Sequence, residues 1–145
     1  MKITSSFCDS TPIPEKYSRD GGDISPPIHI TEVPENTKSL ALICHDPDAS
    51  KPGGWCHWLV WNISPNLVDF NEGTIPQNSV SGMTDWNENH WGGPKPPNGQ
   101  HHYIFTVYAL NTLLNLPSNT NMIEFIEYIK PYVIETARIT GLYKA

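Results

Sequence analysis

Prolines are spread along almost the whole of this chain, and they limit how much regular helix it can form. The sequence holds 14 prolines among 145 residues, roughly twice the usual share. Because proline interrupts both helices and the interior of sheets, this composition favours a loop-rich, β-leaning domain over a helical bundle. At this length we expect a single domain, spanning residues 1–145, that buries a sizeable core.

Four stretches have the composition of strands. Residues 39–44 are almost entirely apolar, residues 56–63 and 102–110 are rich in aromatic and β-branched side chains, and residues 139–143 predict a terminal strand. Residues 56–63 are apolar on both faces, which indicates a central strand. Because long, turn-rich connections join these strands, the pattern favours a β-sandwich over a doubly wound α/β fold.

One helix is expected near the C-terminus. Asn119 or Thr120 can cap it, and apolar residues at helical spacing follow over residues 122–133. Pro131 is expected to break or kink this helix, since proline removes a helical hydrogen bond. A short second helix is expected to follow and to end at about Thr136.

The charge of the chain argues against several partners. The formal net charge is −6 and the isoelectric point is about 5.4. Between Pro52 and Ile129 the only Lys or Arg is Lys95, so the middle of the chain cannot form the basic stripe that nucleic acids require. The same argument disfavours an anionic membrane surface.

The N-terminal residues and the cysteines favour a cytoplasmic location. We find no apolar run long enough for a transmembrane helix and no apolar signal region after Met1. Cys8, Cys44 and Cys56 are odd in number and lack a C-x-x-C spacing, which argues against a disulfide framework. We expect Cys44 and Cys56 to be buried free thiols.

A proline- and glycine-rich loop, residues 93–100, leads into two histidines and a tyrosine at the start of a strand. By strand alternation His101 and Tyr103 share one face, and His102 points away from them. The two histidines are therefore not expected to form a chelating pair, which needs both imidazoles aimed at one point.

Two further pieces of sequence carry candidate site residues. Asp46 and Asp48 flank a proline at the end of a strand, and alternation places both carboxylates on one side. In a pocket they would repel each other and one pKa would rise, although Asp-Pro-Asp is also an ordinary turn sequence. By the same alternation, His57 is expected to share a face with Leu59, Trp61 and Ile63, either as a site residue or as a satisfied core histidine.

Tryptophans accumulate near these candidate residues. Trp55 and Trp58 flank His57, while Trp86 and Trp91 lie in the glycine-rich stretch before the loop. They predict either the rim of a pocket that excludes water or ordinary loop packing. The sequence has no nucleophile elbow, P-loop, G-x-G-x-x-G, H-E-x-x-H or EF-hand motif. It therefore gives no positive sign of standard hydrolase, nucleotide-binding or zinc-protease chemistry.

Several segments together resemble the phosphatidylethanolamine-binding protein family, most of all its bacterial and archaeal branch, often called the YbhB/YbcL or Raf-kinase-inhibitor-like proteins. The resemblance covers nearly the whole chain in the right order. The matching segments are IPEKY (13–17), DISPP (23–27), DPDA (46–49), WCHWLVWNI (55–63), EGTIP (72–76), GPKPP (93–97), HHYIFTVYAL (101–110) and residues 141–143.

The resemblance implies a mainly β fold, an antiparallel Greek-key β-sandwich with one or two short helices near the C-terminus. It also implies a small cavity that binds anions such as phosphate or phosphoethanolamine head groups. His102 falls where many relatives carry arginine. The residues that the resemblance places at the ligand-binding pocket are Asp46, Asp48, Trp55, His57, Pro97, His101 and Tyr103.

From these observations we expect a non-enzymatic binding module without a cofactor, with a small anion or phosphorylated head group as ligand and with a kinase or protease as protein partner. Anion affinity is expected to rise as the pH falls through about 6.5, where unperturbed histidines take up a proton. One alternative is a hydrolase or lyase that uses Asp46, Asp48, His57 and His101, with or without a metal. Another is a structural protein with a vestigial pocket, and the resemblance is also compatible with a homodimer.

Overall fold

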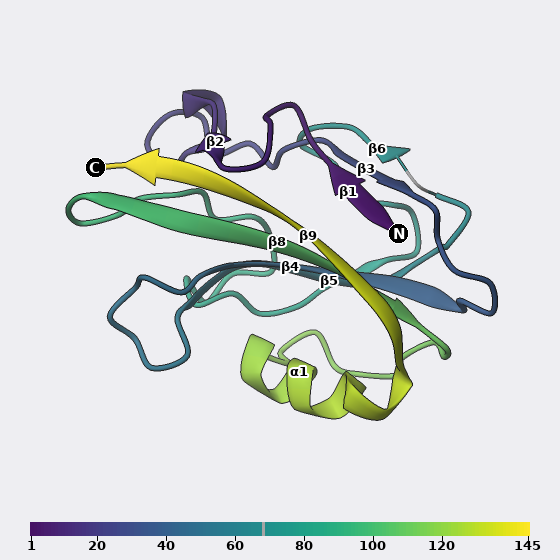
Figure 1. Cartoon of the computed structure of the whole chain (residues 1–145). Helices are drawn as coiled ribbons and strands as arrows, with labels where there is room; N and C mark the ends of the chain where they lie inside the picture. The colour runs from purple at the N-terminus through teal and green to yellow at the C-terminus, as the bar shows by residue number, and fades with distance from the viewer. Residues whose placement is uncertain (68) are drawn as a thin grey trace.

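The computed structural model describes residues 1–67 and 69–145, and its elements form three layers (Figure 1). A six-stranded sheet lies in the middle, with a three-stranded sheet on one face and the helix α1 on the other. In chain order the elements are β1 (Lys2–Thr4), β2 (Thr11–Pro12), the 3-10 helix η1 (Glu15–Tyr17), β3 (Ile28–Thr31), β4 (Ser39–Asp46), β5 (Trp55–Ile63), β6 (Asp69–Phe70), β7 (Val80–Ser81), β8 (Gln100–Leu110), α1 (Met122–Ile129), the 3-10 helix η2 (Lys130–Tyr132) and β9 (Val133–Lys144).

The middle sheet has the strand order β2-β9-β8-β4-β5-β7. Its strands β4, β5 and β7 follow one another, and β8 returns to lie beside β4, which is the connection of a Greek key. Of the strand pairs that the structure describes, β2 with β9 is parallel and the others are antiparallel. The mainly β, Greek-key sandwich expected from the sequence is confirmed, with this one parallel pair added.

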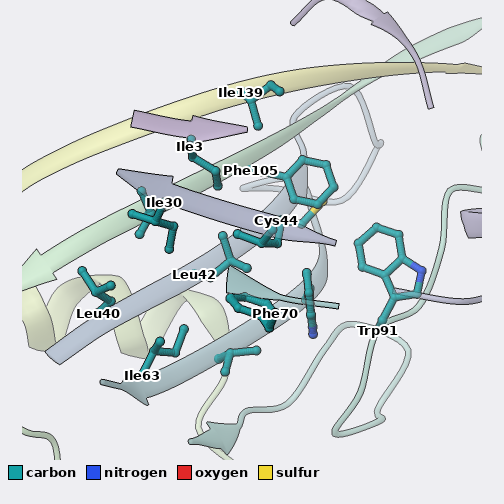
Figure 2. Packing of buried hydrophobic residues seen from close by; sticks show 14 of the residues in the cluster. Ile3, Ile30, Leu40, Leu42, Cys44, Ile63, Phe70, Trp91, Phe105 and Ile139 are labelled. Atoms are coloured by element: carbon teal, nitrogen blue, oxygen red, sulfur yellow. The ribbon is translucent and has the colours of Figure 1, made fainter. Parts of the chain in front are cut away.

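Both faces of the middle sheet are covered, which explains why β4, β5 and β8 are apolar on both sides. Toward the three-stranded sheet, Leu42 and Phe105 pack in one cluster with Ile30 (Figure 2). Toward α1, the rings of Trp61 and Phe125 stack with their centroids 5.3 Å apart. Burial of a large apolar side chain contributes about 1.5–3 kcal/mol, so these strands give firm support to side chains at their ends.

The helix is confirmed, but its flanks differ from the expectation. Its N-cap is Asn121, whose side chain accepts the backbone N–H of Glu124 while Glu124 accepts that of Asn121. This reciprocal pair satisfies two otherwise free donors, which explains why the helix begins after Asn121 and not after Asn119 or Thr120. The expected second helix to Thr136 is wrong: a 3-10 turn ends at Tyr132 and β9 begins at once, because its residues pair along the whole of β8.

The three cysteines are free, as expected. Cys8 is exposed, while Cys44 and Cys56 are buried. Burial raises the pKa of Cys56 to about 12 and that of Cys44 well above its usual value, so both thiols stay protonated at neutral pH. Within the described part of the chain, the structure contains no helix with the length and apolar character needed to cross a membrane.

Candidate functional site

A cavity of about 370 Å³ lies where β4 ends and where β5 and β8 begin. Because these neighbouring strands are antiparallel, the end of β4 and the starts of the other two meet at one edge of the sheet. All seven residues expected at a ligand pocket line this cavity: Asp46, Asp48, Trp55, His57, Pro97, His101 and Tyr103. The structure thus brings the whole set together, while its role in binding stays a prediction.

Asp46, the last residue of β4, supplies the buried carboxylate of the cavity. Its Oδ2 accepts a hydrogen bond from Nδ1 of His101 at 2.6 Å, and its Oδ1 accepts the backbone N–H of Asp48 at 2.8 Å. The two side chains of the pair are only 5% and 11% exposed. Since Nδ1–H of His101 is engaged by the carboxylate, Nε2 is the ring nitrogen that remains for a ligand.

Asp48 lies at the rim of the cavity and is held by His102. Its Oδ2 accepts both the backbone N–H and the Nδ1–H of His102, each at 2.7 Å. These hydrogen bonds, first that of the side chain and then that of the backbone, lower the pKa of Asp48. The expected repulsion with Asp46 and a raised pKa are therefore wrong for Asp48, because the turn directs the two carboxylates to different histidines.

His57 is an extra residue in β5. Cys44 on β4 pairs with Trp58, and the next residue of β4, His45, pairs with Cys56, so that His57 has no partner on β4. Such a β-bulge places two residues opposite one and re-aims a side chain.

The bulge puts His57 on the cavity side of the sheet. Its ring centroid lies 5.1 Å from that of Tyr103, in an edge-to-face arrangement. Leu59 and Trp61 pack on the other face, toward α1, so the expectation that they share a face with His57 is wrong. Ile63 returns to the His57 side because a second register shift precedes it in β5.

The loop around Gly92 fixes the protonation of His57. Nδ1 of His57 lies 2.6 Å from the carbonyl oxygen of Gly92, so it carries the proton and donates it. Burial lowers the pKa of His57, against a smaller opposite effect of the Gly92 carbonyl. The same loop also packs closely on the chain at Tyr17, which requires glycine at position 93, because a Cβ there would lie 2.2 Å from the carbonyl oxygen of Tyr17.

Three hydrogen-bond donors on residues that line the cavity have no partner within residues 1–67 and 69–145. They are the hydroxyl of Tyr103 and the indole N–H groups of Trp55 and Trp86, all buried. Burial raises the pKa of Tyr103, so its hydroxyl stays protonated. An unpaired buried polar group costs about 1–3 kcal/mol, so a bound group that accepts hydrogen bonds from these residues would remove part of that cost.

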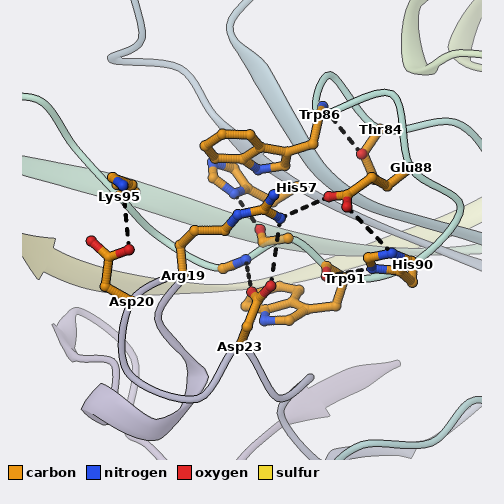
Figure 3. Close-up of polar contacts among 12 residues, drawn as sticks. Arg19, Asp20, Asp23, His57, Thr84, Trp86, Glu88, His90, Trp91 and Lys95 are labelled. Atoms are coloured by element: carbon orange, nitrogen blue, oxygen red, sulfur yellow. Dashed lines mark hydrogen bonds and ion pairs between the residues drawn. The ribbon is translucent and has the colours of Figure 1, made fainter.

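Beyond the seven expected residues, six more line the cavity: Ala49, Ser50, Trp86, Lys95, Pro96 and Asn98. Trp86 meets Trp55 edge-to-face, with ring centroids 5.3 Å apart, and Lys95 comes from the proline-rich loop. Trp86 is also covered by Arg19, whose guanidinium carbon lies 4.1 Å from the ring centroid (Figure 3). The tryptophan-rich stretch and the loop were the signals, but neither fixes which side chain faces inward.

The acidic and imidazole groups of the cavity do not form a metal cage. In the described ranges, 1–67 and 69–145, no three His, Cys, Asp or Glu side chains converge in a way that could hold a metal ion. The two aspartates are instead paired separately, Asp46 with His101 and Asp48 with His102.

Comparison with known proteins agrees with this fold. The chain belongs to the phosphatidylethanolamine-binding protein family, whose sequence profile matches residues 3–144. A UPF0098 protein of Methanothermobacter thermautotrophicus is 40% identical over 146 residues, which are 97% of this chain and 96% of the relative.

Two crystal structures are similar over almost the full chain. The phosphatidylethanolamine-binding protein homolog CT736 of Chlamydia trachomatis is 36% identical, with a TM-score of 0.93 over 99% of this chain and 97% of that chain. YbcL of E. coli, described as a member of the mammalian family, is 31% identical, with a TM-score of 0.94 over 99% of this chain and 98% of that chain.

Proposed function

We propose that this protein is a non-enzymatic binding module whose cavity takes a small anion or a phosphorylated head group, such as phosphate or phosphoethanolamine. The observation that carries the proposal is the set of three buried donors without a protein partner, on Tyr103, Trp55 and Trp86. Phosphate oxygens accept several hydrogen bonds, so one phosphate group can satisfy more than one of these donors.

The acidic side of the same cavity favours a ligand that also carries a positive group. A dianion beside the carboxylates of Asp46 and Asp48 is repelled, since the interaction of like charges grows at low dielectric. An ammonium group near Asp48 offsets this repulsion. Phosphoethanolamine carries both groups, and we therefore expect it to bind more tightly than inorganic phosphate.

The sharpest test is Tyr103→Phe, which removes only the buried hydroxyl. Because the O–H of Tyr103 has no acceptor among the described residues, its removal is expected to change the free energy of unfolding little. Affinity for phosphoethanolamine, measured by isothermal titration calorimetry, is expected to fall about tenfold, the weight of one lost hydrogen bond to a charged group.

The matched control is Tyr108→Phe, on the same strand β8 but outside the cavity lining. It should leave the affinity unchanged. Binding that is equal in Tyr103→Phe and in the parent protein would contradict the proposal, as would the absence of binding of both phosphate and phosphoethanolamine by the parent protein.

A second candidate function is acid–base catalysis, and the Asp46–His101 pair is the observation that favours it. A buried carboxylate that orients an imidazole leaves Nε2 ready to take or give a proton. Turnover of phosphate or carboxylate esters that disappears in His101→Gln would support this hydrolase. Binding without turnover over a panel of such esters supports the binding module.

The protein partner and the homodimer stay predictions. For the dimer, light scattering at high concentration is the direct measurement, and particles of only ~16 kDa, the mass of one chain, would contradict it. For a kinase or protease partner, addition of the protein to the purified enzyme and measurement of its rate is the corresponding test.

A further inference from the structure

The cavity lacks an obvious positive charge for the anion proposed above. Its lining includes the carboxylates of Asp46 and Asp48, and burial lowers the pKa of His57, which keeps that imidazole neutral at pH 7. Among the lining residues of the described chain, Lys95 is the only Lys or Arg. The permanent positive charges that an anion could use are therefore Lys95 and the cations just outside the cavity.

Two such cations, Arg19 and Lys51, already form close ion pairs with carboxylates of the protein. Nη1 of Arg19 lies 2.7 Å from Oε1 of Glu88, and its guanidinium stacks on Trp86 (Figure 3). Nζ of Lys51 lies 2.5 Å from Oδ1 of Asp85, whose other oxygen accepts the backbone N–H at the start of β5. Lys51 holds the carboxylate that supports the start of β5, and Arg19 is held on Trp86 by its ion pair with Glu88, so a ligand could draw either cation inward only by breaking these contacts.

Lys95 is held much more weakly. Its Nζ lies 3.2 Å from Oδ1 of Asp20 (Figure 3), and the two side chains are 53% and 74% exposed. Exposed pairs of this kind contribute about 0–1 kcal/mol. A dianionic group in a partly desolvated cavity attracts an ammonium more strongly than a solvated carboxylate does. It can therefore replace Asp20 as the partner of the Lys95 ammonium.

The loop also allows this exchange without backbone movement. Lys95 lies between Pro94 and Pro96, with Pro97 next, and prolines fix the local backbone. Its side chain has four rotatable carbon–carbon bonds and is free to turn from one side of the loop to the other.

We propose that Lys95 is an anion-binding residue of this cavity, which exchanges its partner Asp20 for the phosphate group of the ligand. This inference rests on the proposed function, because it assumes that an anion binds. It assigns opposite roles to two exposed residues: Lys95 recruits the anion, and Asp20 competes with it for the same ammonium.

The test is titration of inorganic phosphate and of phosphoethanolamine into the parent protein, Lys95→Gln, Asp20→Asn and the double variant. We expect Lys95→Gln to bind phosphate about tenfold more weakly, the weight of one charge-assisted hydrogen bond. Asp20→Asn is expected to bind about twofold more tightly, since it releases the lysine from an exposed ion pair. In the double variant, Asp20→Asn should no longer increase the affinity for phosphate, because Asp20 affects the anion only through its ion pair with Lys95.

The control is the pair Lys130–Glu127 beside α1, with side chains 64% and 74% exposed and outside the cavity lining. Lys130→Gln and Glu127→Gln change the net charge in the same way and should leave both affinities unchanged. If Lys95→Gln binds as tightly as the parent protein, or if Lys130→Gln weakens binding equally, the role of Lys95 is overturned while the anion site stands. If the parent protein binds neither phosphate nor phosphoethanolamine, the anion site itself is overturned, and this inference with it.

Discussion

Two aspartate–histidine pairs stand side by side at the end of β4, and they differ mainly in their access to water. Asp46 and His101 form the inner pair, with side chains 5% and 11% exposed. Asp48 and His102 form the outer pair, with side chains 41% and 52% exposed. The residue types of the two pairs are the same, and the distances from the histidine Nδ1 to the aspartate Oδ2, 2.6 and 2.7 Å, are nearly equal. The comparison shows that burial, and not the contact itself, decides whether such a pair supports the fold or only orients a group at the rim.

The largest effect is expected from breaking the inner pair. Asp46→Ala leaves the buried Nδ1–H of His101 and the backbone N–H of Asp48 without acceptors, and should lower the free energy of unfolding by about 3 kcal/mol. Asp48→Ala should lower it by less than about 1 kcal/mol, since exposed pairs contribute little. Urea unfolding followed by circular dichroism measures both, and equal losses would contradict the role given to burial.

A smaller effect on the free energy of unfolding is expected from a change in pH. It comes from His57, which has no carboxylate as a hydrogen-bond partner among the described residues. Burial lowers the folded-state pKa of His57 and also that of His45, so below about pH 6.5 the unfolded chain takes up these protons first. The free energy of unfolding should therefore fall as the pH drops from 6.5 toward the lowered pKa values. His57→Asn should reduce this slope by at most ~1.4 kcal/mol per pH unit, the value for one proton.

The carboxyl of Asp48 titrates in a separate pH window. The pKa of Asp48 is lower in the folded protein than in the unfolded chain. Its contribution to the free energy of unfolding is therefore complete above pH ~4 and is lost only as the pH falls through the folded-state pKa. The titration of the Asp48 carboxyl itself therefore adds no slope between pH 7 and 5. A slope in that range that His57→Asn does not alter would show that His57 is not its source.

The smallest effect is expected from strengthening the outer pair. His102→Arg introduces a side chain that is charged at every accessible pH, whereas histidine is neutral in alkaline solution. At pH 8 we expect a gain of about 0.5 kcal/mol in the free energy of unfolding, typical of an exposed pair, and at pH 5 almost none. Thermal unfolding at the two pH values measures the difference, and a loss of stability at pH 8 would contradict the expected pairing with Asp48.

The parts of the fold that could be predicted are those set by local pattern. The strands over residues 39–44, 56–63 and 102–110 were found from apolar runs and β-branched residues, and each is one or two residues longer at the cavity end in the structure. The start of β9 was missed because exposed residues alternate with half-buried ones from Val133 onward. Such a segment becomes a strand only through its long-range pairing with β8.

The features of the candidate site also divide into those that sequence patterns predict and those that depend on how strands pair. His101 and Tyr103 were placed on one face by simple alternation, and the structure agrees because β8 pairs with β9 without a register shift there. His57 was assigned to the wrong face because a bulge is a relation between two strands and leaves no mark in one of them. The pairing of Asp46 and Asp48 with different histidines also lies beyond sequence patterns, since it depends on how β8 meets the turn after β4.

The bulge in β5 has a consequence for how this site can change over time. The inward direction of His57 depends on the one extra residue that β5 has opposite Cys44 and His45 of β4, as much as on the histidine itself. Deletion of the neighbouring Cys56 would restore regular alternation and turn the imidazole away from the cavity, although the histidine itself remained. Sequences that differ by one residue in length at this point can therefore share every motif and still carry differently built cavities.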